Sequence, residues 1–122
     1  MSKILIIEDE SAIRNVIQNI LQEEDKNYKV DVAEDGEIGL NKIKETDYDL
    51  IICDIKMPKK DGVEVMEESL EYNPDLTFVM ISGHGDIDTA VDCIKKGAFD
   101  YISKPPDLNR FLSTVRNALD RK

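Results

Sequence analysis

The chain has 122 residues, a length that suits a single domain with one hydrophobic core. Its net charge of -10 at pH 7 argues against nucleic-acid binding through clustered lysine and arginine. No apolar stretch approaches the roughly 20 residues that cross a bilayer, and the N-terminus does not read as a secretory signal. We therefore expect one cytoplasmic domain over residues 1–122, with no membrane segment and no direct nucleic-acid binding.

Strand-like and helical patterns alternate along the first half of the chain. A strand is expected over residues 3–7, and Asp35-Gly36 opens a second helix after a half-buried strand at residues 28–33. Residues 50–53 form a continuous apolar strand, and a helix follows over about residues 62–72. The first helix carries apolar residues at the spacing of one helical face: Ile13, Val16, Ile17, Ile20 and Leu21.

The same alternation continues to the end of the chain. Residues 78–82 and 100–103 are expected to be strands, and Gly97 is expected to end the helix between them. That helix has the apolar stripe Ile87, Ala90, Val91 and Ile94. The last helix has the stripe Leu108, Phe111, Leu112, Val115 and Leu119.

This order of elements predicts an α/β fold with a parallel sheet. The first, third and fourth strands are continuously apolar, as strands covered on both faces are, whereas the second and fifth are not. Placing the second and fifth at the edges gives a doubly wound, flavodoxin-like domain: a five-stranded parallel sheet in the order 2-1-3-4-5, with five helices. Its crevice should lie at the carboxyl ends of strands one and three.

The two cysteines show neither C-x-x-C nor metal-finger spacing. Cys53 lies inside an apolar strand and Cys93 inside a helical pattern. We therefore interpret both as reduced core residues.

Acidic residues follow the two strands that meet at the predicted crevice. Glu8 and Asp9 follow the first strand, and Asp54 follows the third. Carboxylates this close repel one another unless a cation intervenes, and Mg²⁺ binds through a few carboxylates while keeping water ligands. The alternatives are that Glu8 and Asp9 form a solvated turn that caps the next helix, and that Asp54 is an ordinary loop acid.

Two further polar residues should reach the same edge of the sheet. Lys104 follows the fifth strand, and its ammonium could pair with Asp54 and then with a phosphoryl oxygen. Ser82 ends the fourth strand in a glycine-containing turn, where backbone amides can approach an anion. Taken alone, these residues would be an ordinary surface lysine and turn serine.

Together these residues resemble the receiver domain of two-component response regulators. The resemblance covers the whole chain and rests on five pieces: Glu8-Asp9, Asp54, Met57-Pro58 with Gly62, Ser82-Gly83 and Lys104-Pro105. It implies phosphorelay signal transduction, in which a sensor histidine kinase passes a phosphoryl group to the domain, and the domain then changes conformation to control an output domain. It implies no enzyme acting on other molecules, only assistance to the domain's own phosphotransfer and dephosphorylation.

The resemblance also implies a role for each site residue. Asp54 is the implied phosphoacceptor, and Ser82 and Lys104 bind the phosphoryl oxygens. Glu8, Asp9, Asp54 and the backbone carbonyl of Lys56 are the implied ligands of Mg²⁺. Ser82 and Tyr101 are the implied switch residues, and Lys56 and His84 lie where they could modulate the hydrolysis of the phosphoaspartate.

The residues after the fourth strand resemble receivers of NtrC-like, sigma-54-dependent transcriptional regulators. This resemblance rests on residues 82–86, 89–91 and 96–101. It implies a parent protein in which an ATPase domain and a DNA-binding domain follow the receiver, and it allows for a homodimer. The alternative is a stand-alone receiver that acts through protein–protein interaction. One departure is Pro106, where the family more often has a bulky apolar residue; the Lys104-Pro105 bond is usually cis in the family.

Two other functions fit the residues less well. A phosphohydrolase with an aspartyl nucleophile needs a second acid two residues later, and Lys56 occupies that position. A nucleotide- or flavin-binding module would carry G-x-G-x-x-G or G-x-x-x-x-G-K-[ST], and the sequence contains neither.

Overall fold

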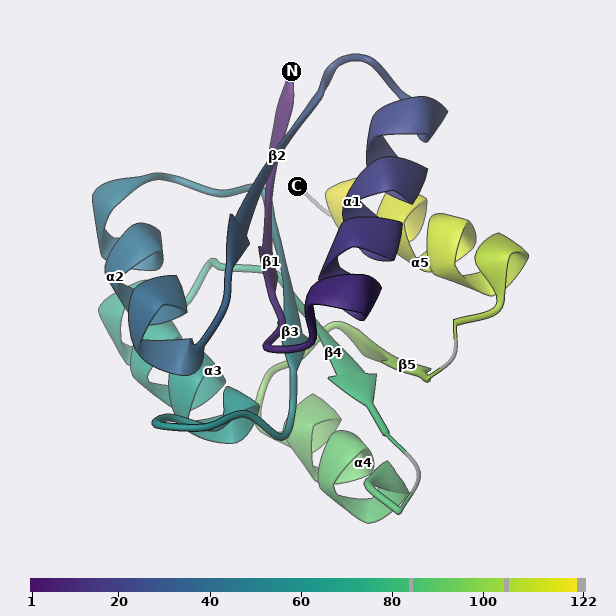
Figure 1. The fold of residues 1–122 in the computed structure, drawn as a ribbon. Coiled ribbons are helices and arrows are strands. Elements are labelled where there is room, and N and C mark those ends of the chain that lie inside the picture. The colour runs from purple at the N-terminus through teal and green to yellow at the C-terminus, as the bar shows by residue number, and fades with distance from the viewer. Residues whose placement is uncertain (84, 105, 121–122) are drawn as a thin grey trace.

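The computed structural model describes residues 1–83, 85–104 and 106–120, and within them strands and helices alternate (Figure 1). The strands are β1 (Ser2–Ile7), β2 (Tyr28–Ala33), β3 (Leu50–Asp54), β4 (Phe78–Ser82) and β5 (Asp100–Ser103). The helices are α1 (Ser11–Glu24), α2 (Gly36–Glu45), α3 (Gly62–Tyr72), α4 (Ile87–Lys95) and α5 (Leu108–Asp120). The predicted elements are all present, with small shifts at their ends.

The strands form one parallel sheet in the order β2-β1-β3-β4-β5. The predicted doubly wound, flavodoxin-like fold is therefore confirmed. The register pairs Ile7 with Cys53, so β1 and β3 end side by side. The winding reverses between these two strands, which places a crevice at their carboxyl ends.

Helices cover both faces of the sheet: α1 and α5 lie on one side, and α2, α3 and α4 on the other (Figure 1). Successive residues of β1 point to opposite faces, so Ile4 and Ile6 pack with α1 and α5, whereas Leu5 and Ile7 pack against the other layer. The strands β3 and β4 are buried along their whole length. Each large apolar side chain buried in this way contributes about 1.5–3 kcal/mol relative to exposure, which holds the strand ends rigidly in place.

Local signals at the helix ends act as predicted. The Asp35 side chain accepts a hydrogen bond from the Ile38 amide and so caps the start of α2. Gly97 follows α4 with a φ of +126°, a conformation that glycine adopts without strain. Both cysteines are buried free thiols, as interpreted from the sequence.

The predicted apolar stripes are only partly buried. In α1, Ile17 and Leu21 are buried but Val16 is 52% exposed. In α4, Ala90 is buried, whereas Ile87 is as exposed as Val16. Other apolar residues left substantially exposed in these stripes are Val91, Ile94 and Leu108. A helix on a flat sheet buries only a narrow strip of its surface, so residues at the flank of a stripe remain outside the core. Within the described residues, no helix combines the length and the apolar character needed to span a bilayer.

Candidate functional site

Three carboxylates meet where β1 and β3 end. Glu8 directly follows β1 and is fully buried, Asp54 ends β3 and is 3% exposed, and Asp9 is exposed. One oxygen from each side chain lies within 4.8 Å of the others. The sequence predicted this meeting from the order of the strands, and the structure brings the three residues together.

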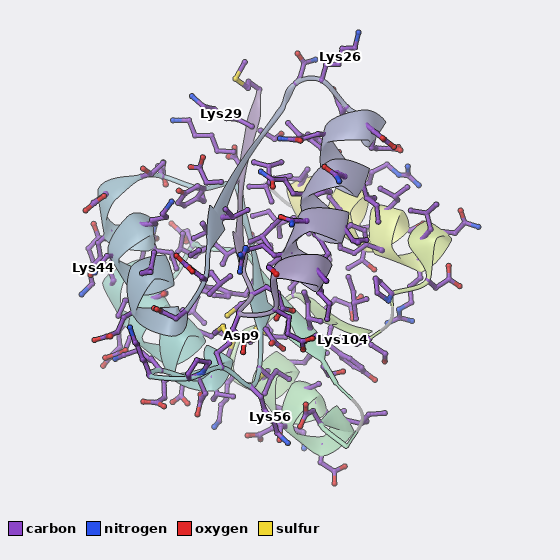
Figure 2. All side chains as sticks on the ribbon, viewed as in Figure 1. Asp9, Lys26, Lys29, Lys44, Lys56 and Lys104 are labelled. Carbon is purple, nitrogen blue, oxygen red and sulfur yellow. The ribbon has the colours of Figure 1, made fainter. Side chains whose placement is uncertain are left out.

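Lys104 reaches this cluster from the end of β5. Its Nζ lies 3.0 Å from Glu8 Oε1, 3.1 Å from Asp54 Oδ2 and 3.6 Å from Glu10 Oε1. Its backbone amide donates to the Ser82 carbonyl, which continues the pairing of β5 with β4. Figure 2 shows Asp9 and Lys104 at the same end of the sheet. The predicted pairing of Lys104 with Asp54 is therefore present in the structure.

The electrostatics of the cluster favour an additional cation. Burial and then the negative charge of Glu8 raise the pKa of Asp54 to about 7, and the nearby Lys104 only partly opposes this. Burial works against the charge of Lys104, but hydrogen bonding to Glu8 and the charge of Asp54 outweigh it and raise its pKa. One lysine faces three carboxylates, so the donor set and its uncompensated charge suit a hard divalent cation.

Contacts in the loop between β1 and α1 hold the acidic pair in place. Arg14 Nη1 donates to the backbone carbonyl of Glu8 at 2.8 Å and, more distantly, to that of Asp9 at 3.5 Å. The Glu10 amide donates to Glu8 Oε2 at 3.1 Å. Glu10 is the N-cap of α1 and makes no side-chain hydrogen bond there. Glu8 is fully buried, so it does not lie in the solvated turn of the alternative interpretation. The sequence does not indicate the contacts of Glu10 and Arg14, because charged residues are common near the start of a helix.

A close backbone approach fixes Asp54 on the other side. The Gly62 amide donates to the Ile55 carbonyl at 2.7 Å, and a Cβ on Gly62 would lie 2.0 Å from the Asp54 carbonyl oxygen. The Ile55 amide donates to the Ile81 carbonyl, which extends the pairing of β3 with β4 beyond Asp54. The loop after β3 therefore folds back tightly and leaves Asp54 one defined position.

Ser82 ends β4 with a buried hydroxyl that has no hydrogen-bond partner among the described residues. A buried hydroxyl without a partner costs free energy, and such groups are uncommon in native structures. Ser82 and Lys104 line the same cavity of about 390 Å³, together with Gly83 and Ser103. The structure thus places Ser82 beside Lys104 at the carboxyl end of β4, with its buried hydroxyl unpaired among the described residues.

The side chain of Lys56 takes part in a contact that the sequence did not predict. Its Nζ lies 3.0 Å from Asp86 Oδ1, and Figure 2 shows the residue beyond Asp9 and Lys104, toward α4. Asp86 is buried, and its Oδ2 accepts a hydrogen bond from the Gly83 amide. The sequence shows only that an acid, Asp86, lies four residues after Ser82. It does not define the path of the turn that brings Asp86 to Lys56.

Four of the roles expected from the sequence are not tested by the contacts described above. Tyr101 is half-buried on β5, which is compatible with the predicted change of rotamer, and the Lys56 carbonyl as a metal ligand stays a prediction. His84 and Pro105 lie outside the described residues, so the role of His84 and the isomer of the Lys104-Pro105 bond stay predictions as well.

The fold and site define a class of protein: a doubly wound α/β domain with an acidic crevice, a lysine and a serine at the ends of four neighbouring strands. The family model of the response regulator receiver domain matches residues 4–116. The chain belongs to this family of signalling domains from two-component systems.

The chain is similar to both long and short members of the family. It is 34% identical to the transcriptional regulatory protein ZraR of Klebsiella oxytoca over 116 residues, which cover 95% of this chain and 26% of ZraR. It is 35% identical to the chemotaxis protein CheY of Listeria monocytogenes, over 97% of this chain and 98% of CheY. This chain therefore spans about a quarter of ZraR but nearly all of CheY.

The chain is also similar to a solved structure of a receiver domain. The receiver domain of NtrX from Brucella abortus matches with a TM-score of 0.91 and 35% identity, over 98% of this chain and 99% of that one. The relatives ZraR and NtrX agree with the resemblance to NtrC-like regulators at the level of the receiver domain.

Proposed function

We propose that residues 1–122 form one receiver domain that accepts a phosphoryl group on Asp54. The observation that carries this proposal is the buried Asp54 carboxylate, fixed at the end of β3 with an oxygen 3.1 Å from Lys104 Nζ and beside Glu8 and Asp9. A nucleophile held rigidly next to a cationic group is suited to phosphoryl transfer, where catalysis rests on positioning and charge neutralisation.

The transfer starts from the ionised form of Asp54. A carboxylate oxygen attacks the phosphorus of a phosphohistidine on the donor, in line with the bond that breaks. The phosphorus–nitrogen bond breaks, and the imidazole leaves with the bonding electrons and takes up a proton. The product is an acyl phosphate on Asp54, and Lys104 neutralises part of the charge that develops on the phosphoryl oxygens. The domain thus assists its own modification and acts on no other substrate.

The acidic cluster fits Mg²⁺ as a cofactor. Glu8, Asp9 and Asp54, with the backbone carbonyl of Lys56, would hold the ion. The support is the meeting of three carboxylate oxygens within 4.8 Å and the raised pKa of Asp54. When bound, Mg²⁺ supplies positive charge that keeps Asp54 ionised and stabilises the transferred phosphoryl group.

The transfer would then act as a switch. Ser82 has a buried hydroxyl that lacks a partner within the described part of the chain, and a phosphoryl oxygen on Asp54 would give it one. Movement of Ser82 toward Asp54 would shift the loop after β4 and open space for Tyr101 to turn inward. Such a change works through contacts that differ between two pre-existing states.

A sensor histidine kinase is the proposed donor, acting in the cytoplasm. An apolar groove of about 430 Å³ lies next to the site, lined by Ala12, Ile13, Val16, Ile17, Lys104 and Pro106. Because Lys104 borders both the groove and Asp54, a protein docked in the groove could present its phosphohistidine to the crevice. The exposure of Val16 at the flank of the α1 stripe fits this use.

Two outputs are supported by different relatives. The similarity to ZraR favours a parent protein in which ATPase and DNA-binding domains follow the receiver and control transcription, with dimerisation of the receiver as one route of control. The similarity to CheY over nearly its whole length favours a stand-alone receiver that acts by binding another protein.

The proposal is tested by intact mass after incubation with acetyl phosphate. We expect the chain to gain one phosphoryl group when Mg²⁺ is present, and none with a chelator. Asp54→Asn should gain none under either condition, because an amide does not act as the acceptor, whereas Asp47→Asn, at an exposed position, should behave as wild type. Incorporation into Asp54→Asn at the wild-type level would show that another residue is the acceptor.

We further propose that Lys56 and His84 influence the lifetime of the phosphoaspartate, because both follow the strand ends that flank Asp54. Replacing both with alanine should change the half-life of the phosphorylated chain several-fold, since water then approaches the acyl phosphate differently. The half-life is measured as loss of the added mass after removal of acetyl phosphate. An unchanged half-life would exclude both residues from the hydrolysis.

A further inference from the structure

We propose that Asp86 is a positioning residue that holds the Lys56 ammonium in the unphosphorylated state and competes with the phosphoryl group for it. This inference rests on the proposed function of Asp54. Asp86 is not the proposed acceptor, and it is not one of the proposed metal ligands or switch residues. Asp86 has no individual role in the sequence-based predictions, and the contacts of its carboxylate assign it one.

Both oxygens of the Asp86 carboxylate are engaged. Oδ1 lies 3.0 Å from Lys56 Nζ, and Oδ2 accepts a hydrogen bond from the Gly83 amide at 3.2 Å. The Asp86 side chain is only 7% exposed, whereas that of Lys56 is 77% exposed. A buried carboxylate needs a cation or hydrogen-bond donors, and the exposed Lys56 supplies a cation at the cost of its own side-chain freedom.

The ion pair joins the two loops that border the phosphorylation site. Lys56 lies two residues after Asp54, in the loop that follows β3, and Asp86 lies four residues after Ser82, in the loop that follows β4. The Asp86 amide donates back to the Gly83 carbonyl, and the Asp86 carbonyl accepts from the Ala90 amide in the first turn of α4. A movement of Asp86 is therefore passed to the neighbour of Ser82 and to the start of α4.

A phosphoryl group on Asp54 would change the balance of charge for Lys56. The group carries more negative charge than one carboxylate and presents several acceptor oxygens. It would attract the ammonium away from Asp86, and the loop that Asp86 closes would lose its cationic contact. The loop after β4 could then rearrange and bring Ser82 toward the phosphoryl group. The free energy needed to break the Lys56–Asp86 ion pair would therefore oppose formation of the phosphorylated state.

The test is the affinity for beryllium fluoride, a phosphoryl-like ligand of carboxylates, measured with Mg²⁺ present. Asp86→Asn keeps an oxygen for the Gly83 amide but loses the charge that holds Lys56, so binding should tighten by about three- to tenfold. In a Lys56→Gln background the same substitution should leave the affinity unchanged, because the pair is already broken. Asp88→Asn removes a charge from the exposed side of the same helix turn and serves as the matched control, with wild-type affinity expected.

The outcomes separate this inference from the proposed function. If wild type binds but Asp86→Asn binds no more tightly, or tightens equally in the Lys56→Gln background, the role of Asp86 is wrong while that of Asp54 stands. If wild type does not bind at all, the proposed function fails and the inference fails with it.

A second measurement does not depend on phosphoryl binding. In the free protein, Lys56→Gln should shift the amide resonance of Gly83, which donates to Asp86, more than Lys59→Gln does. Equal shifts in the two variants would overturn the inference even if Asp86→Asn failed to fold.

Discussion

Asp54→Asn is expected to raise the free energy of unfolding of the metal-free protein by about 2–4 kcal/mol at pH 7.5. Burial and the charge of Glu8 raise the pKa of Asp54 to about 7 in the folded protein, against roughly 3.9 in an unfolded chain. Folding thus works against the ionised form of Asp54. Asparagine keeps the size of the side chain without the charge, and Lys104 keeps its contact with Glu8 at 3.0 Å.

The sign of this effect depends on pH. Below about pH 3 the carboxyl is protonated in both states, so it does not affect the free energy of unfolding. As the pH rises toward 7, the unfolded chain releases its proton first, and the wild type loses stability until the folded carboxyl ionises as well. The difference between Asp54→Asn and wild type should therefore be small at pH 4 and largest above pH 7.

Urea denaturation in the presence of a chelator, at both pH values, measures this difference. Addition of Mg²⁺ should stabilise wild type more than the variant, because the proposed Mg²⁺ site of the folded state includes the Asp54 carboxylate. A variant that is less stable than wild type at pH 7.5, or a difference that does not change with pH, would contradict the assigned electrostatics of the cluster.

Gly62→Ala is expected to lower the free energy of unfolding by about 3 kcal/mol or more, as overpacking against a fixed backbone does. The added Cβ would lie 2.0 Å from the Asp54 carbonyl oxygen, so either the loop after β3 or the end of β3 must move. Gly62 is the first residue of α3, and alanine elsewhere in a helix stabilises by about 1 kcal/mol relative to glycine. A loss of stability would therefore come from the close approach.

Gly85→Ala is the matched control. Gly85 has a φ of +91° but open space around its Cβ position, so alanine there should cost only about 1–2 kcal/mol of conformational strain. Denaturant unfolding of both variants gives the comparison. If Gly62→Ala were as stable as wild type, the backbone of Asp54 would not be held in the way that the structure indicates.

The edge positions of β2 and β5 could be predicted from composition, and the flavodoxin-like order 2-1-3-4-5 fits those positions. The apolar runs that became β1, β3 and β4 are continuous because helices cover both of their faces, and the less apolar β2 and β5 lie at the edges. Parallel strands share one carboxyl edge, so the sequence was sufficient to place Glu8, Asp9, Asp54 and Lys104 together.

Side-chain contacts that depend on the path of the loops could not be predicted in this way. The pairing of Lys56 with Asp86 depends on the path of two loops, and nothing in the local sequence of either residue specifies the other. The helix pattern also treated Val16 as equivalent to Ile17, although only Ile17 reaches the sheet. Which residues of a stripe are buried depends on how the helix is rotated against its neighbours, and hydrophobic spacing leaves that rotation undefined.

The most direct measurement is the position of the phosphoryl group. Borohydride reduces an aspartyl phosphate to homoserine with release of phosphate, so the acceptor can be located by peptide mass spectrometry after treatment with acetyl phosphate and Mg²⁺. We predict homoserine at position 54, absent when a chelator replaces Mg²⁺. Homoserine at position 9 instead, or no homoserine in a chain that has gained the mass of a phosphoryl group, would contradict the assignment of Asp54 as the acceptor.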